Sequence, residues 1–156
     1  MDDLDRRLLH RLMRNGRATW SDLAVELGIT APAIAQRVRR LERAGVIRQF
    51  AAWVDPQAVA PLAAFVSAWL PADGDHGAFR EQAAKLEPVQ ECHWVAGEDA
   101  YLLKVRCATT AQLERLVRTL TDDLGAARTR TRVVLATVKE SPVLPMGDDP
   151  AEEGRP

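Results

Sequence analysis

The sequence predicts an α+β protein in which a small helical module precedes a larger domain of strands and helices. The hydrophobic period changes near Leu62, from the three-to-four-residue spacing of helices to the continuous and alternating runs typical of strands. Residues 1–50 contain 10 Arg and no Lys against 6 Asp and Glu, whereas residues 51–156 contain 11 Lys and Arg against 16 Asp and Glu. A basic module on an acidic remainder suggests a DNA-facing part joined to a part with another task.

The first 28 residues are predicted to form two helices. Residues 3–15 carry leucines at every fourth position, which gives this helix an apolar stripe, and acidic residues at its start suit the helix dipole. Residues 19–27 form the second helix, because Thr19 and Asp22 have the spacing of a capping box. Gly28 can adopt the left-handed conformation that ends a helix, and the second helix therefore stops there.

Residues 30–44 form the third predicted helix, after a short turn that contains Gly28. Ile34, Val38 and Leu41 make its apolar stripe, and three arginines occupy the opposite side. Two helices joined by such a turn, with a basic outer face on the second, are typical of a helix-turn-helix that binds DNA. Taken alone, the charged face of the third helix has a plain alternative, which is simple solvation.

The arginine-rich side of the third helix is the candidate DNA-binding surface. We expect Gln36, Arg39 and Arg40 to lie closest to base edges or phosphates, because these side-chain types read bases and bind phosphate. Arg37 flanks the apolar stripe, and the alternative is that it ties the helix to Glu42 or to the first helix. The complete predicted DNA-contacting set is Thr30, Ala31, Pro32, Ala33, Gln36, Arg37, Arg39, Arg40, Arg43 and Arg48.

The rest of the chain is predicted to form a second domain. Residues 46–55 are extended, as a short wing-like strand or as a linker, and Pro56 and Pro61 mark the boundary. The elements then follow at residues 62–70, 77–86, 89–96, 100–107, about 109–124 and 127–139. Their order is strand, helix, strand, strand, helix, strand, which matches the ferredoxin-like βαββαβ arrangement. The predicted domains are residues 1–50 (winged-type helix-turn-helix), 51–61 (linker strand), 62–140 (ferredoxin-like) and 141–156 (disordered tail).

A four-stranded sheet with helices on one face leaves its other face open. We expect that open face to be apolar, with residues of the kind of Ala64, Val66, Leu103 and Val134. Because exposing such a face is costly, the sequence predicts sheet-to-sheet dimerisation. The alternation itself leaves open which set of side chains points outward.

Several function classes are disfavoured by the residues. The adjacent Cys92 and His93 point to opposite faces of a strand and cannot form a nucleophile–base pair. The spacing of Cys92 and Cys107 fits no metal site, and no phosphate-binding loop occurs, so we expect neither an enzyme nor a cofactor. The charged N-terminus lacks a signal-peptide core, and the apolar residues 58–71 are too short to span a bilayer. A cytoplasmic protein without membrane contact is the expectation.

Four segments carry a resemblance to a known family. They are LDRRLLHRLMRNGRATWSDLAVELGIT, IAQRVRRLERAGVIRQF, HWVAGEDAYLLKV and RTRTRVVLATVK, in this order and spacing. Together they resemble the Lrp/AsnC (feast/famine) transcriptional regulators over residues 2–140. The resemblance implies a DNA-binding regulator that dimerises through a ligand-sensing domain, often assembles further into tetramers or octamers, and responds to an amino acid or a related small molecule. An architectural DNA-binding protein of this fold, independent of any effector, is the alternative.

The turn between the second and third predicted strands, residues 97–101, is the candidate effector site. Its backbone N–H groups could hold a carboxylate, and Glu98 or Asp99 could receive an α-ammonium. The resemblance places the last strand, with Thr129 and Thr131, near the same pocket. The alternative is that these are ordinary turn and strand residues. The predicted effector-binding set is Trp94, Val95, Gly97, Glu98, Asp99, Ala100, Tyr101, Thr129 and Thr131.

Overall fold

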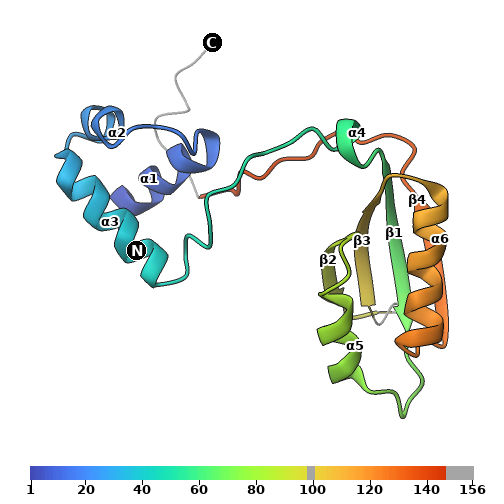
Figure 1. Ribbon diagram of the computed structural model, residues 1–156. Helices are drawn as coiled ribbons and strands as arrows, with labels where there is room; N and C mark the ends of the chain where they lie inside the picture. The colour runs from blue at the N-terminus through green and yellow to red at the C-terminus, as the bar shows by residue number, and fades with distance from the viewer. Residues whose placement is uncertain (98–100, 147–156) are drawn as a thin grey trace. The chain divides into compact units, whose positions relative to one another are not determined.

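The computed structural model of the protein describes residues 1–97 and 101–146. The chain divides into two compact units, which are described separately here (Figure 1). The first unit contains Met1–Trp53 together with the described residues that follow Val138, and the second unit is Val54–Val138.

The first unit is built from three helices around one apolar core. The helices are α1 (Asp3–Arg14), α2 (Trp20–Leu27) and α3 (Ala31–Arg43). The side chains that fill the core come from the three predicted stripes and are Leu8, Leu9, Leu12, Leu23, Ala24, Leu27, Ile34, Val38 and Leu41. The predicted helix-turn-helix is confirmed, with α2 and α3 as its two helices.

The ends of these helices follow from their capping residues. Thr19 and Thr30 accept hydrogen bonds from backbone N–H groups in the first turns of α2 and α3, as their positions predict. Gly28 has φ +70°, in the left-handed region, and ends α2. At the start of α1 the sequence analysis recognised only favourable charges, whereas the structure has a complete capping box between Asp2 and Asp5.

The segments that flank the sheet domain contain little regular structure. Residues 46–55 have no strand, so of the two predicted alternatives the structure has the linker. It is followed by the single turn α4 (Pro56–Val59). Residues 141–146 have neither helix nor strand, and Met146 packs against the core of the first unit. The remainder of the predicted disordered tail, residues 147–156, lies outside the described residues.

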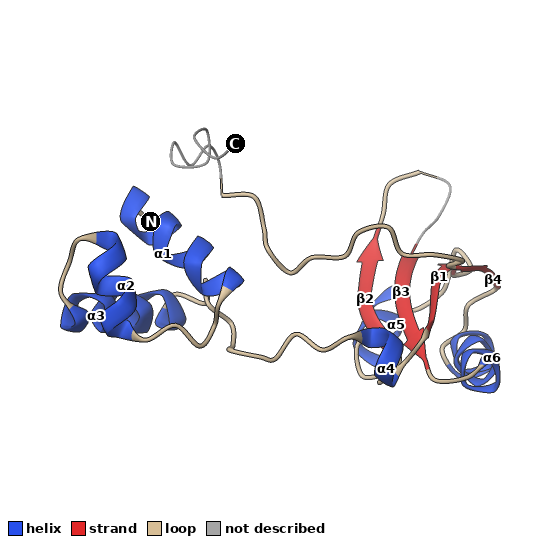
Figure 2. Cartoon of the chain, turned by 90° about the horizontal axis from the view of Figure 1, so that it is seen from above, coloured by secondary structure: helices blue, strands red, loops and turns tan. Residues whose placement is uncertain are grey.

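The second unit is an antiparallel sheet with two helices packed on one face (Figure 2). The strand order is β2-β3-β1-β4, and the chain order β-α-β-β-α-β is the predicted ferredoxin-like one. The elements are β1 (Leu62–Trp69), α5 (His76–Ala83), β2 (Val89–Trp94), β3 (Tyr101–Cys107), α6 (Thr110–Arg118) with a wider π-helical turn (Thr119–Asp123), and β4 (Arg128–Val133).

The last strand is shorter than predicted. We expected residues 127–139, but β4 ends at Val133. The reason lies in its partner strand: β1 begins at Leu62, Val133 pairs with Ala64, and Val134 N–H donates to the carbonyl of Ala63. Beyond Ala63, β1 has one more residue, Leu62, and Pro61 before it has no N–H group to donate. The apolar alternation of residues 135–138 therefore continues without a strand partner in the described part of this chain.

The two faces of the sheet differ from the prediction. Ala64, Val66 and Leu103 lie in the core beneath α5 and α6, so they do not line the open face. The pairing register instead places a mostly cationic and aromatic set there, namely Phe65, Trp69, Lys104, Arg106, Arg128, Arg130 and Arg132. The Arg128 guanidinium stacks over the Trp69 ring at 4.0 Å. The same face also holds Ala63, Ser67, Glu91, His93 and Leu102. The expectation that Ala64, Val66 and Leu103 line the open face was wrong, because the larger aliphatic side chains of the strands, with the exception of Leu102, belong to the helix-covered side.

Candidate nucleic-acid interface and effector site

The outer face of α3 carries the predicted DNA-contacting side chains. Burial of Ile34, Val38 and Leu41 fixes the rotation of the helix, and the opposite side therefore faces solvent. Of the predicted set, Ala31, Ala33 and Arg37 are half-buried, and the others are exposed, namely Thr30, Pro32, Gln36, Arg39, Arg40, Arg43 and Arg48. The N-terminal end of the helix therefore carries small side chains that would lie at the entry to a DNA groove, and the rest of its outer face is cationic.

Two of the arginines are engaged by the first helix. The Nη1 group of Arg37 donates to Asp2 and to Asp5, both at 2.7 Å. The Nη2 group of Arg40 donates to both carboxylate oxygens of Asp5, at 2.7 and 2.6 Å. For Arg37 the structure therefore has the tie to the first helix rather than to Glu42. The signal that could have suggested these contacts was the acidic start of α1, which was assigned only to the helix dipole.

The pKa values of the two acids reflect this network. The hydrogen bond from Arg37, with that from the Asp5 backbone, lowers the pKa of Asp2 to about 2. At Asp5, burial opposes ionisation, yet hydrogen bonds from the Asp2 backbone and from Arg37 prevail and hold its pKa below the ordinary value. Both carboxylates are therefore ionised at neutral pH, and the pKa of Arg37 is raised in return.

Arg39 and Arg43 are arranged differently. In the described part of the chain no carboxylate lies within ion-pair distance of either guanidinium, and Arg43 Nε donates only to the backbone carbonyl of Arg39, at 3.3 Å. A cation without a protein counter-ion is available to a phosphate, which supplies affinity but no sequence information.

The predicted effector residues divide between two edges of the sheet. The register aligns Trp94 with Tyr101, Tyr101 with Ala68, and Ala68 with Thr129, in one row across β2, β3, β1 and β4. Three strand spacings of ~4.8 Å separate Trp94 from Thr129, or ~14 Å. Val95 and Gly97 follow the β2 edge, and Thr131 lies with Thr129 on the β4 edge. The predicted Glu98, Asp99 and Ala100 lie outside the described residues.

Tyr101 is turned into the core rather than toward a ligand. Its ring is 1% exposed and packs 4.7 Å from that of Phe79, and its hydroxyl lies 2.9 Å from His76 Nδ1 at the start of α5. The contact joins two segments 25 positions apart, which local spacing does not reveal.

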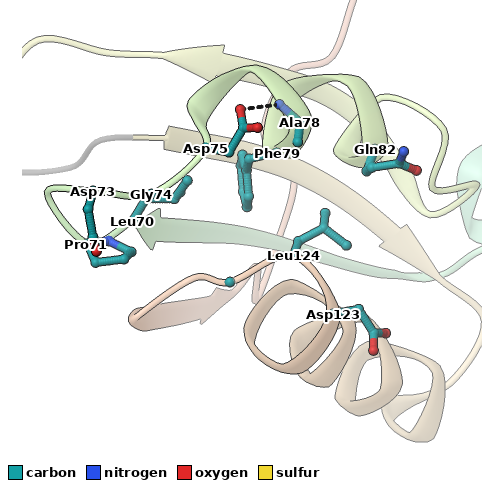
Figure 3. Close-up of a pocket in the computed structure, with 11 residues that line it drawn as sticks. Leu70, Pro71, Asp73, Gly74, Asp75, Ala78, Phe79, Gln82, Asp123 and Leu124 are labelled. Atoms are coloured by element: carbon teal, nitrogen blue, oxygen red, sulfur yellow. Dashed lines mark hydrogen bonds between the residues drawn. The ribbon is translucent and has the colours of Figure 1, made fainter.

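A pocket of about 420 Å³ opens at the same end of the sheet as this tyrosine (Figure 3). Phe79 and Leu124 contribute apolar surface, and the segment around Gly74 and the turn after the π-helical segment form its rim. Asp75, at the rim, accepts a hydrogen bond from Ala78 N–H and caps α5. Of the predicted effector residues that the structure describes, none lines this pocket.

Comparison with known families matches both units. Residues 1–42 match the AsnC-type helix-turn-helix domain, and residues 63–144 match the Lrp/AsnC ligand binding domain. The chain belongs to the Lrp/AsnC family. It is therefore a DNA-binding transcriptional regulator with a ligand-binding domain, and the predicted family and fold class are confirmed.

Curated members of the Lrp/AsnC family resemble the chain over most of its length. The HTH-type transcriptional regulator LrpA of Mycobacterium tuberculosis is 38% identical over 140 residues, which cover 88% of this chain and 91% of that protein. The leucine-responsive regulatory protein of Escherichia coli K12 is 37% identical, over 90% of this chain and 88% of its own. Both relatives are regulators, and no enzyme family is indicated.

Solved structures of Lrp/AsnC proteins share the fold. A transcriptional regulator from Neisseria meningitidis, crystallised as a complex with L-methionine, has a TM-score of 0.86 at 28% identity and covers 94% of this chain and 97% of its own. The leucine response regulatory protein of M. tuberculosis has a TM-score of 0.81 at 35% identity, covering 90% and 96%. Among the described residues no helix is long and apolar enough to cross a membrane.

Proposed function

We propose that this Lrp/AsnC regulator binds a specific operator with the exposed face of α3, and that an amino acid or related small molecule bound between C-terminal domains modulates its activity or assembly. The observation that carries the DNA half is the exposed surface of Gln36, Arg39, Arg40 and Arg43 opposite a fully buried stripe. Arginine and glutamine are the side chains that read base edges in the major groove. Such a regulator works where the chromosome is, hence the expected cytoplasmic location.

The operator is expected to be a degenerate palindrome bound by a two-fold homodimer. One recognition helix reads only a few base pairs, so two copies must place their helices about one DNA turn, ~34 Å, apart. A dimer would also cover Leu135 and Val138, which are each 99% exposed in the single chain. Higher even-numbered assemblies, such as octamers, are proposed from the family alone.

The effector half rests on the family domain and on the methionine complex of a structural neighbour. Because the predicted effector residues occupy two edges of one sheet, we propose that the complete site uses residues from more than one chain. Glu98 and Asp99 remain the proposed partners of the α-ammonium group. The competing proposal is an effector-independent architectural protein, which differs in that no amino acid would shift its thermal midpoint.

The DNA half is tested by selection of binding sites from a random duplex library with the full-length protein. We expect one enriched palindrome, and a DNase footprint that covers both half-sites. The variant Arg39→Glu with Arg40→Glu should weaken this binding strongly, and the residual binding measured at low salt should have a smaller salt slope, since each phosphate contact contributes about one unit to the slope. Unchanged operator affinity and salt slope in that variant would exclude this face of α3.

The effector half is tested by thermal denaturation with each common amino acid. A ligand at 100 times its dissociation constant stabilises the folded protein by about 2.7 kcal/mol, which is a readily measured shift. Calorimetry with the responding amino acid then compares the native protein with Asp99→Ala. Binding that is unaffected by this substitution would remove Asp99 from the site, and no shift with any amino acid would favour the architectural alternative.

A further inference from the structure

Asp5 is a buried carboxylate that joins the first helix to the recognition helix. Its side chain is 1% exposed, and the capping box at the start of α1 holds it in place through a 3.0 Å hydrogen bond from the backbone N–H of Asp2. Its two oxygens accept hydrogen bonds from Arg37 and Arg40, both from α3. One fixed acid of α1 therefore determines where two guanidinium groups of α3 lie.

Arg40 is held but not hidden by this contact. Its side chain remains 55% exposed, although its Nη2 group donates to both oxygens of Asp5. Arg40 stands one helical turn after Gln36, so both side chains lie along one line of the exposed face. The Nη1 and Nε donors of Arg40 are not bound by Asp5. Because these two groups lie on different edges of the guanidinium plane, the two N–H groups of Nη1 are the pair that can reach one base edge.

Arg37 keeps the Asp5 carboxylate paired when Arg40 also contacts another group. Since Arg37 binds both Asp2 and Asp5, the buried carboxylate keeps one cationic partner even while Arg40 engages another group. The low pKa of Asp5 agrees with an anion that stays ionised at neutral pH. A long, flexible arginine is thus given one orientation before DNA binds, which lowers the ordering cost of the contact.

We propose that Asp5 is a positioning residue for DNA recognition, which fixes the Arg40 guanidinium so that its remaining donors meet the O6 and N7 acceptors of a guanine beside the base read by Gln36. This inference rests on the proposed operator binding and adds a residue outside the recognition helix to it. It distinguishes Arg40, which reads sequence, from Arg39 and Arg43, which bind phosphate.

The test uses the full-length protein and the duplex selected from the random library, with a scrambled duplex of equal length. Asp5→Asn keeps a hydrogen-bond acceptor but removes the charge. Asp3→Asn is the matched control, because Asp3 lies in the same helix, is exposed and pairs with Arg6 of its own helix. We expect Asp5→Asn to lower the affinity ratio of selected to scrambled duplex by about tenfold, as for loss of one bidentate base contact. The base preference at one position of each half-site should be lost with it.

Two further variants separate positioning from simple stabilisation. Arg40→Gln should lower the ratio by a similar factor, and the double variant with Asp5→Asn should lose no more than either alone. If Asp5→Asn does not fold, Arg40→Lys decides the matter, since it keeps the charge and the Asp5–Arg37 pair but lacks the guanidinium fork. It should lower binding to the selected duplex and leave the scrambled duplex unaffected.

The proposal is overturned by any of three results. Asp5→Asn or Arg40→Lys could retain the native affinity ratio, or lower affinity for both duplexes equally, which would make Arg40 a phosphate contact. The losses from Asp5→Asn and Arg40→Gln could also add fully, which would make them independent. If the native protein selects no duplex at all, operator binding itself fails, and that result is distinct from these three.

Discussion

At the scale of single residues, one buried acid of α1 binds two arginines of α3, and these contacts hold the first helix against the recognition helix. The apolar stripe of α3 and its basic outer face could be read from local spacing, since both depend only on helical periodicity. The contacts of Asp5 with Arg37 and Arg40 span 32 and 35 positions, and they depend on how α1 packs against α3. The spacing of residues in the sequence does not indicate how α1 and α3 pack together. The same reason explains why His76 was not connected to Tyr101.

The acid–arginine network predicts how stability changes with pH. The pKa values of Asp2 and Asp5 are lower in the folded protein than in the unfolded chain, so their ionised forms stabilise the fold. This contribution is complete above about pH 4, the ordinary aspartate pKa, and is lost as the pH falls through the folded values, about 2 for Asp2. We expect the thermal midpoint of the helical unit, followed by circular dichroism, to fall between pH 4 and pH 2.

Asp5→Asn should flatten this pH dependence, and Asp3→Asn should leave it as in the native protein. The comparison is matched because both residues lie in α1, but only Asp5 is buried against α3. If the two variants and the native protein lose stability in parallel, other carboxylates control the acid transition.

At the scale of elements, the ends of the first three helices and of the first three strands were predicted to within about two residues, and the end of the last strand was not. A helix begins and ends at its own capping residues, and Thr19, Gly28 and Thr30 indicate those positions in the sequence. A strand ends where its neighbour ends, as β4 does at the start of β1. Alternation along a strand likewise assigned the side chains to two faces of the sheet. It did not indicate which face carries the helices, because that depends on tertiary packing.

The turn between α2 and α3 gives a prediction of its own. Gly28 has φ +70°, and a Cβ atom there would meet nothing within 4 Å. Gly28→Ala should therefore cost only the backbone strain of the left-handed conformation, about 1 kcal/mol in the free energy of unfolding. Urea denaturation measures it.

Gly16→Ala is the control for that substitution. Gly16 does not have a positive φ, and its added Cβ would lie 3.7 Å from the Leu12 carbonyl, an ordinary contact. We expect a change below about 0.5 kcal/mol there. Equal losses at both glycines would show that the left-handed conformation of Gly28 is not what limits substitution in this unit.

At the scale of the whole molecule, the sequence indicated a self-associating protein for a reason that the structure corrects. The open face of the sheet carries arginines beside Phe65, Trp69 and Leu102, so it is not the aliphatic face that was expected, and dimerisation through it stays a prediction. Among the apolar side chains of the second unit, Leu135 and Val138 after β4 are the most exposed, at 99% each. Sequence patterning identified these residues as apolar, but it assigned them to a strand because the missing partner was not visible in a single chain.

Association through this segment can be tested by charge substitution. Leu135→Glu with Val138→Glu should shift the mass measured by light scattering at micromolar concentration toward the monomer, because burying an unpaired carboxylate in an apolar contact is costly. Val25→Glu is the control, because Val25 is 87% exposed on α2. The mass of this variant should equal that of the native protein. An unchanged mass in the double variant would remove this segment from the interface.

The contacts of Asp5 with Arg37 and Arg40 also limit how the DNA preference of this protein can be changed, either by engineering or during evolution. A recognition helix transplanted from a relative with other residues at positions 37 and 40 would leave the Asp5 carboxylate enclosed without a counter-ion, at a cost of roughly 3–5 kcal/mol. Successful chimaeras should therefore exchange the first and third helices together, and acid and arginine should be inherited as a unit.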